Sequence, residues 1–199
     1  MAEFKLLGGT DAALTSLGKM TQGLGFPLHD VESSTSGGPV TIISENVLES
    51  SNFTDQGPTL IGVAYQVLFG GVSATPQWSM DAAGAATCLE ADEYTIRLRT
   101  VVGRTGGAGE AQIYQRVLIN GAQVGSSSQV IVDNDRIEIP LFYNQTISFN
   151  VNDVLTFEII RDTDGNNSGG LTAGNPDVVG WNPGPSASLS LSRTRAVES

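Results

Sequence analysis

The chain has 199 residues, enough for one ordinary domain with an appendage. Its 21 acidic residues outnumber its 10 Lys and Arg residues, for a net charge of −11. Residues 1–57 hold two basic and seven acidic side chains and residues 58–199 hold eight and fourteen, so the acidity is spread along the chain. An acidic surface repels a phosphate backbone, and we therefore expect no nucleic acid partner.

Two single residues limit the chemistry of the chain. Cys88 is the only cysteine, which excludes an intramolecular disulfide and a cysteine-based zinc site within one chain. We expect Cys88 to be a small, half-buried hydrophobic side chain. His29 is the only histidine and lies outside the strand-rich part, so Ser–His–Asp or Cys–His catalysis is not expected.

The sequence predicts neither a membrane span nor a secretory signal. No apolar run approaches the roughly 18 residues of a membrane span. The N-terminus carries Glu3 and no long apolar stretch, which is atypical of a signal peptide. We expect a protein made in a cytoplasm; if it acts outside the cell, it leaves as part of a larger particle or by lysis.

Residues 1–39 are predicted to form an N-terminal arm and linker. Thr10 is a suitable N-cap for about two helical turns that end at Gly18, too short to be stable without a surface to dock on. The alternatives are a floppy terminus and an arm that orders on a partner. The arm's apolar side chains would bind that partner, among them Leu6, Leu7, Leu14, Leu17 and Phe26.

Residues 40–199 are predicted to be a single β domain. Alternation and β-branched or aromatic content predict strands, and Asn120-Gly121 is a strong hairpin signal. Polar turns are predicted at Asn144-Gln145 and Asn152-Asp153. The pattern indicates an all-β sandwich or barrel. The predicted strands are 40–43, 59–69, 93–101, 112–119, 122–124, 136–143, 146–151, 154–161 and 186–192.

The Gly-rich segment 103–109 offers no phosphate-binding loop. It lacks the Gly-Lys-Ser/Thr ending and joins two predicted strands, whereas a phosphate cradle needs a following helix. Acidic residues for glycoside hydrolysis are plentiful, but nothing in the sequence pairs two of them across a groove. We therefore predict that the protein is not an enzyme and needs no cofactor.

The predicted loop 162–185 contains one candidate metal site. Asp162, Asp164 and Asn166 place oxygen ligands at alternate positions, as at the start of an EF-hand calcium loop. The match then fails, because Asn167 stands where Gly is needed and Ala173 where Glu is needed. The alternatives are an Asx-rich turn and a looser Ca²⁺ or Na⁺ site.

Each of the two tryptophans has two interpretations. Trp181 lies in a Pro-bounded loop, where it would either stack on a sugar or insert into a partner, or cover one end of its own core. Trp78 carries the same ambiguity.

Residues 147–162 resemble a segment of a known protein family. An alternating strand, a two-residue polar turn and a second alternating strand resemble the late hairpin of TNF/C1q-like jelly rolls, here followed by the Gly- and Asn-rich segment 165–171. The whole looks like segments of tailed-phage virion proteins such as capsid decoration (cement) proteins and fibre heads. The resemblance implies an antiparallel jelly-roll β-sandwich with an extended N-terminal arm, a homotrimer, and no catalytic residues.

These observations lead to ranked hypotheses of function. The first is a virion protein that decorates a phage capsid, docks on the major capsid protein and stabilises the shell. The alternative is the receptor- or carbohydrate-binding head of a tail or head fibre, with loops 103–110 and 162–185 contacting a cell-surface glycan. A polysaccharide depolymerase has no supporting constellation, and a cellular TNF-like or C1q-like ligand is disfavoured by the absence of a signal peptide and of paired cysteines.

Overall fold

The computed structural model describes residues 40–104, 110–132, 138–163 and 169–198. Within it, Thr41–Val197 form one compact unit. The predicted arm lies outside the described residues, and so do its five proposed partner-binding side chains. Its role therefore remains a prediction.

The described part of the chain consists of β-strands and irregular segments. The shorter strands lie between β1 and β6 and after β10. The strands are β1 (Val40–Asn52), β2 (Tyr65–Gln66), β3 (Ser73–Ala74), β4 (Trp78–Met80), β5 (Ala86–Cys88), β6 (Asp92–Gly103), β7 (Ala111–Ile119), β8 (Ala122–Val132), β9 (Glu138–Phe149), β10 (Val154–Arg161), β11 (Gly170–Leu171) and β12 (Ala187–Glu198).

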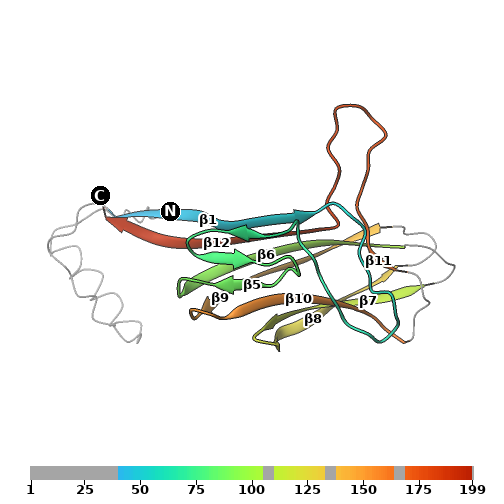
Figure 1. The fold of residues 1–199 in the computed structure, drawn as a ribbon, viewed down its shortest axis with the longest axis horizontal. Helices are drawn as coiled ribbons and strands as arrows, with labels where there is room; N and C mark the ends of the chain where they lie inside the picture. The colour runs from blue at the N-terminus through green and yellow to red at the C-terminus, as the bar shows by residue number, and fades with distance from the viewer. Residues whose placement is uncertain (1–39, 105–109, 133–137, 164–168, 199) are drawn as a thin grey trace, which may run out of the picture. The chain divides into compact units, whose positions relative to one another are not determined.

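The strands form two sheets that pack face to face. One sheet has the order β1-β12-β6, with β9 and β11 also paired to β6. The other has the order β3-β4-β5-β10-β7-β8, with β2 also paired to β10. Figure 1 shows β1, β12 and β6 in one layer and β10, β7 and β8 in the other.

The pairing is nested from the ends of the chain inward. The first strand, β1, pairs with the last, β12; then β5 pairs with β10, β6 with β9, and β7 with β8. Such nesting of outer around inner hairpins wraps one long antiparallel ribbon into a two-sheet sandwich. The fold is a jelly roll. The predicted fold class is confirmed.

Alternation along the strands builds the core. In β6, Tyr94, Ile96 and Leu98 are buried while Arg97 is exposed, as the period-two pattern predicts. From the opposite sheet, the buried side chains Leu155, Phe157 and Ile159 of β10 close the core. Each fully buried apolar side chain of this size contributes roughly 1.5–3 kcal/mol of transfer free energy.

An aromatic cluster lies at one end of this core. The Trp78 ring meets Tyr94 and Phe149 edge to face, with ring centroids 5.1 and 5.0 Å apart. Trp78 is fully buried, so the core interpretation of this residue is the correct one. Cys88 is also fully buried, more than the half-buried position expected.

The Asn120-Gly121 hairpin forms as predicted between β7 and β8. Both residues have positive φ, 53° and 78°, which matches the type I′ turn that suits the twist of the two strands. The return strand β8 is longer than the predicted 122–124, because it pairs with β7 over nearly its whole length.

Two strand predictions are wrong. Asn144-Gln145 is not a turn but part of β9, because both residues pair with Arg97 and Ile96 of β6 in one continuous ladder. Segment 59–69 is not one strand, since only Tyr65–Gln66 form a ladder with β10, Ile61 makes an isolated parallel bridge to Arg161, and Gly62 has a φ of 71°. Its apolar content reflects Val67 and Phe69 filling the core from an irregular backbone.

Candidate functional site

The segment after β11 forms a hairpin that projects from the sandwich. Figure 1 shows it as the orange-brown loop that leaves the layer of β1 and β12 on the side away from β10. Its stem is the pair Gly174 and Gly184, each of which donates its N–H to the other's carbonyl oxygen, at 3.0 and 2.8 Å. Pro176 lies shortly after Gly174 and Pro183 lies directly before Gly184, and both prolines restrict the backbone of the loop.

The tip of this loop is a tight turn of apolar residues. The N–H of Trp181 donates to the carbonyl oxygen of Val178 at 3.3 Å, and Gly180 between them has a φ of 92°. Positive φ at this place in a turn favours glycine. Val179 is 100% exposed, Trp181 73% and Val178 63%. Hence Trp181 does not cover its own core, and that interpretation is wrong.

A shallow hollow of about 550 Å³ lies on the outer face of the β1-β12-β6-β9 sheet. The strand register sets two rows across it: Ser188, Arg99 and Phe142 in one, and Ser190, Arg97 and Asn144 in the next. The serines of β12 are short and the arginines of β6 are long, so the face is low over β12, between β1 and β6. Phe142 stands beside the hollow with 66% of its surface exposed.

The two arginines of this hollow form no ion pair with the residues that the structure describes. Each makes one long hydrogen bond of 3.4 Å, Arg97 to the Ser192 hydroxyl and Arg99 to the Pro185 carbonyl. Glu49 lines the hollow too, and its carboxylate accepts a hydrogen bond from Asn46. The hollow is therefore a local positive patch on an acidic protein.

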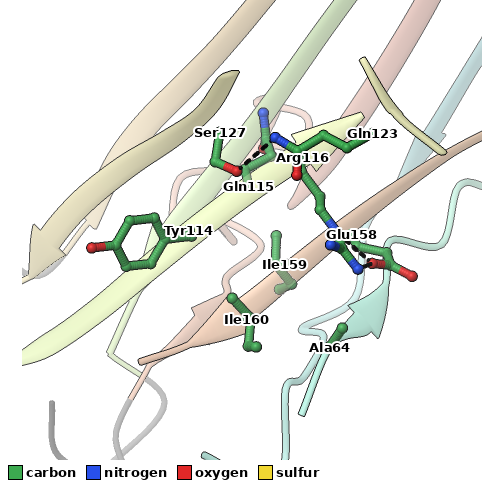
Figure 2. A pocket seen from close by; sticks show the side chains of 9 residues that line it. All are labelled: Ala64, Tyr114, Gln115, Arg116, Gln123, Ser127, Glu158, Ile159 and Ile160. Atoms are coloured by element: carbon green, nitrogen blue, oxygen red, sulfur yellow. Dashed lines mark hydrogen bonds and ion pairs between the residues drawn. The ribbon is translucent and has the colours of Figure 1, made fainter. Parts of the chain in front are cut away.

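A second, smaller pocket of about 210 Å³ lies over β7, β8 and β10 on the other sheet. Figure 2 shows Arg116 and Glu158 paired across it, with an Nη2–Oε2 distance of 2.5 Å. The two residues are direct cross-strand neighbours, so the pair neutralises its own charge and strengthens the sheet. Tyr114 and Gln123 add polar groups to the lining, and Ile159 and Ile160 add apolar ones (Figure 2).

A metal site, a membrane span and a reactive thiol each place their own requirements on the described residues. They contain no group of three or more His, Cys, Asp or Glu placed to hold a metal ion. Within the same ranges, no helix is long and apolar enough to cross a membrane. The thiol of Cys88 is buried and burial raises its pKa, which disfavours the reactive thiolate.

Of the three proposed calcium ligands, only Asp162 lies within the described residues. Asp162 follows β10, and its Oδ1 accepts hydrogen bonds from the N–H and hydroxyl of the next residue, Thr163, at 2.6 and 3.2 Å. Asp164 and Asn166, the other proposed ligands, lie outside the described residues. The ion site therefore stays a prediction.

The sequence located the projecting loop and its Trp181 but missed the hollow. Alternation placed Arg97 and Arg99 on the solvent side of β6, which is correct. Long-range pairing places β12 and β9 on either side of β6, and these strands add Ser188 and Phe142 to the hollow. No local signal carries that information.

Comparisons with known proteins add little to this description. No protein-family profile matches the chain, and no curated protein matches it. Among solved structures, the chain is similar to murine APRIL at pH 8.5, with 12% identity, a TM-score of 0.43, and coverage of 74% of this chain and 98% of that one. It is also similar to the Eiger TNF of S. frugiperda, with 10% identity, a TM-score of 0.41, and coverage of 78% and 97%. At these scores the jelly-roll assignment rests on the strand pairing of this chain itself.

Proposed function

We propose that the protein is a non-catalytic structural component of a tailed-phage virion: a capsid decoration protein that docks on the major capsid protein, stabilises the shell and assembles as a homotrimer. The observation that carries the proposal is the projecting loop with its apolar tip. A hydrophobic tip that the described residues leave mostly exposed gains free energy when a partner covers it. The buried, chemically inert core beneath it suits a scaffold more than a catalyst.

Two features of the sequence support the virion setting. Charged residues make up only 16% of the chain, which favours packing into an assembly. The apolar side chains of residues 1–39 suit an arm that orders on a partner surface. The resemblance of residues 147–171 to phage virion segments favours a phage shell as that partner.

The test compares the full chain with a version that starts at Pro39. Both are measured for mass by light scattering and are then incubated with undecorated phage shells. We expect both to be trimeric, and only the full chain to coat shells and raise their disruption temperature. If neither binds shells, the decoration proposal is wrong.

A second candidate function is the carbohydrate-binding head of a fibre. Trp181 stands exposed on a loop that also carries Asn175 and Asn182, and a flat aromatic ring beside amide groups suits a sugar. Glycan-array binding that Trp181→Ala abolishes would favour this function over decoration. An array without signal would count against it.

A further inference from the structure

Two surfaces of this molecule are complementary to each other. The tip of the projecting loop presents Val178, Val179 and Trp181 together with the carboxylate of Asp177. The hollow on the outer face of the β1-β12-β6-β9 sheet presents Phe142 beside Arg97 and Arg99. One surface is convex, apolar and acidic, and the other is concave, partly aromatic and basic.

Among the described residues, the tip and the hollow do not meet within one molecule. Val179 is fully exposed, and Val178 and Trp181 are mostly exposed, so the described part of the sandwich leaves most of the tip's surface uncovered. The loop leaves its own sheet on the side of that sheet's outer face (Figure 1), which is also the side of the hollow. The loop and the hollow are therefore both open to neighbouring molecules on that side.

We propose that the tip of one copy seats in the hollow of a second copy, so that the chain assembles head to tail through its loop. The charge distribution selects this occupant, because Arg97 and Arg99 have no ion pair among the described residues while the chain as a whole is acidic. Asp177 is the carboxylate that the tip brings to these arginines. An indole ring beside a guanidinium adds a cation–π contact, and Phe142 supplies an apolar wall.

Different surface patches on the two partners make this contact heterologous. Such contacts close into a ring when the rotation between copies permits it, and a ring of three is the closure that the proposed homotrimer requires. The inference thus rests on the self-association part of the proposed function and names its interface. Trp and Arg are the residue types that most often dominate binding energy, so few side chains should carry the junction.

The experiment uses full-length protein and sedimentation over a range of concentrations. Trp181→Ser and Arg97→Asp are each expected to weaken self-association by about 100-fold, because each removes a central anchor. The matched controls are Val72→Ser and Glu138→Lys, which change an exposed valine and an exposed acid elsewhere and should leave the mass unchanged. Circular dichroism and thermal melts confirm that each variant is folded.

Two mixing and rescue tests sharpen the result. Asp177→Arg alone should dissociate the assembly, and combining it with Arg97→Asp should restore much of it. An equimolar mixture of Trp181→Ser and Arg97→Asp should form dimers and stop there, because only one intact junction remains between the two variants.

Each outcome decides the proposal. Recovery by charge reversal and arrest at the dimer support the head-to-tail junction. The proposal is overturned if the folded variants keep the wild-type mass, or if the wild-type protein is monomeric at all concentrations. It is also overturned if a trimer dissociates only when another face is altered. Shell binding by the same variants separates this result from the decoration role. If the variants stay trimeric and still coat shells, the junction is refuted and decoration is not. If the variants dissociate but the wild-type protein never coats shells, decoration is refuted and the junction is not.

Discussion

At the scale of single residues, the described part of the molecule concentrates its ion pairs on one arginine. The side chain of Arg193 is only 3% exposed, and its guanidinium lies 2.7 Å from Glu90, 3.1 Å from Glu45 and 3.5 Å from Asp92. Hydrogen bonds to Glu90 and Glu45 raise its pKa above the ordinary value. These contacts tie β12 to β1 and to the turn before β6.

Removing this charge should destabilise the fold. We expect Arg193→Met to lower the free energy of unfolding by about 3 kcal/mol, because three carboxylates lose a buried counter-charge. Urea denaturation measures the loss. The control is Arg195→Met, since Arg195 is half exposed and lies 3.6 Å from Glu45, and its removal should cost less than about 0.5 kcal/mol. Equal losses in both variants would contradict this account.

The hydrogen bonds of Asp153, in the turn before β10, should make the stability of the fold depend on pH in the acid range. The Asp153 carboxylate accepts hydrogen bonds from the Asn150 N–H at 2.8 Å and from the Asn120 amide at 2.7 Å, which lower its pKa below the usual 3.8. A lowered folded-state pKa means that the stabilisation is present above the unfolded-state pKa and is lost as the pH falls through the folded-state value.

We therefore expect the stability of the wild type to fall more steeply below pH 4 than that of Asp153→Asn, which keeps an acceptor but cannot titrate. Thermal melts from pH 6 to pH 2.5 measure the difference. Parallel curves for the two proteins would show that Asp153 contributes nothing to acid sensitivity.

At the scale of elements, the projecting loop is separate from the structure that carries it. Within the described residues, residues 174–183 are exposed, and the hydrogen-bonded Gly174–Gly184 pair closes the stem. The core is made by the strands on either side, through Leu171 before the loop and Ala187 after it. The loop therefore adds little to folding.

Replacing residues 175–183 by Asn-Gly tests this separation. An Asn-Gly turn fits directly between a hydrogen-bonded antiparallel pair such as Gly174 and Gly184. We expect the free energy of unfolding to change by less than about 1 kcal/mol, because no core side chain is removed and the loop becomes shorter. Self-association should be lost at the same time. A large loss of stability would mean that the loop supports the fold.

At the scale of the whole molecule, the jelly roll depends on the two ends of the chain meeting. β12 lies between β1 and β6, so the last of the described strands is central to its sheet. Leu189 and Leu191 of β12 are buried in the core. The fold has many such long-range pairings, a topology in which local segments are not stable alone.

Deleting residues 187–198 should therefore prevent folding, whereas a start at Pro39 should not. Loss of β12 removes buried leucines and leaves strand edges open on both β1 and β6, and open edges favour aggregation. Expression followed by size exclusion and circular dichroism distinguishes the two truncations. A soluble, monomeric product lacking β12 would contradict the central role of this strand.

Period-two alternation in the sequence is enough to predict the all-β class and the inward faces of β6 and β10. The Asn120-Gly121 hairpin is predictable too, because it depends on local turn geometry. Tertiary structure decided the rest. Asn144-Gln145 resembles a turn locally but stays extended because β6 pairs with it, and the apolar segment 59–69 stays irregular because it fills the core from the side. The hollow with Arg97, Ser188 and Phe142 exists only where three strands distant in sequence become neighbours, and no local pattern encodes that neighbourhood.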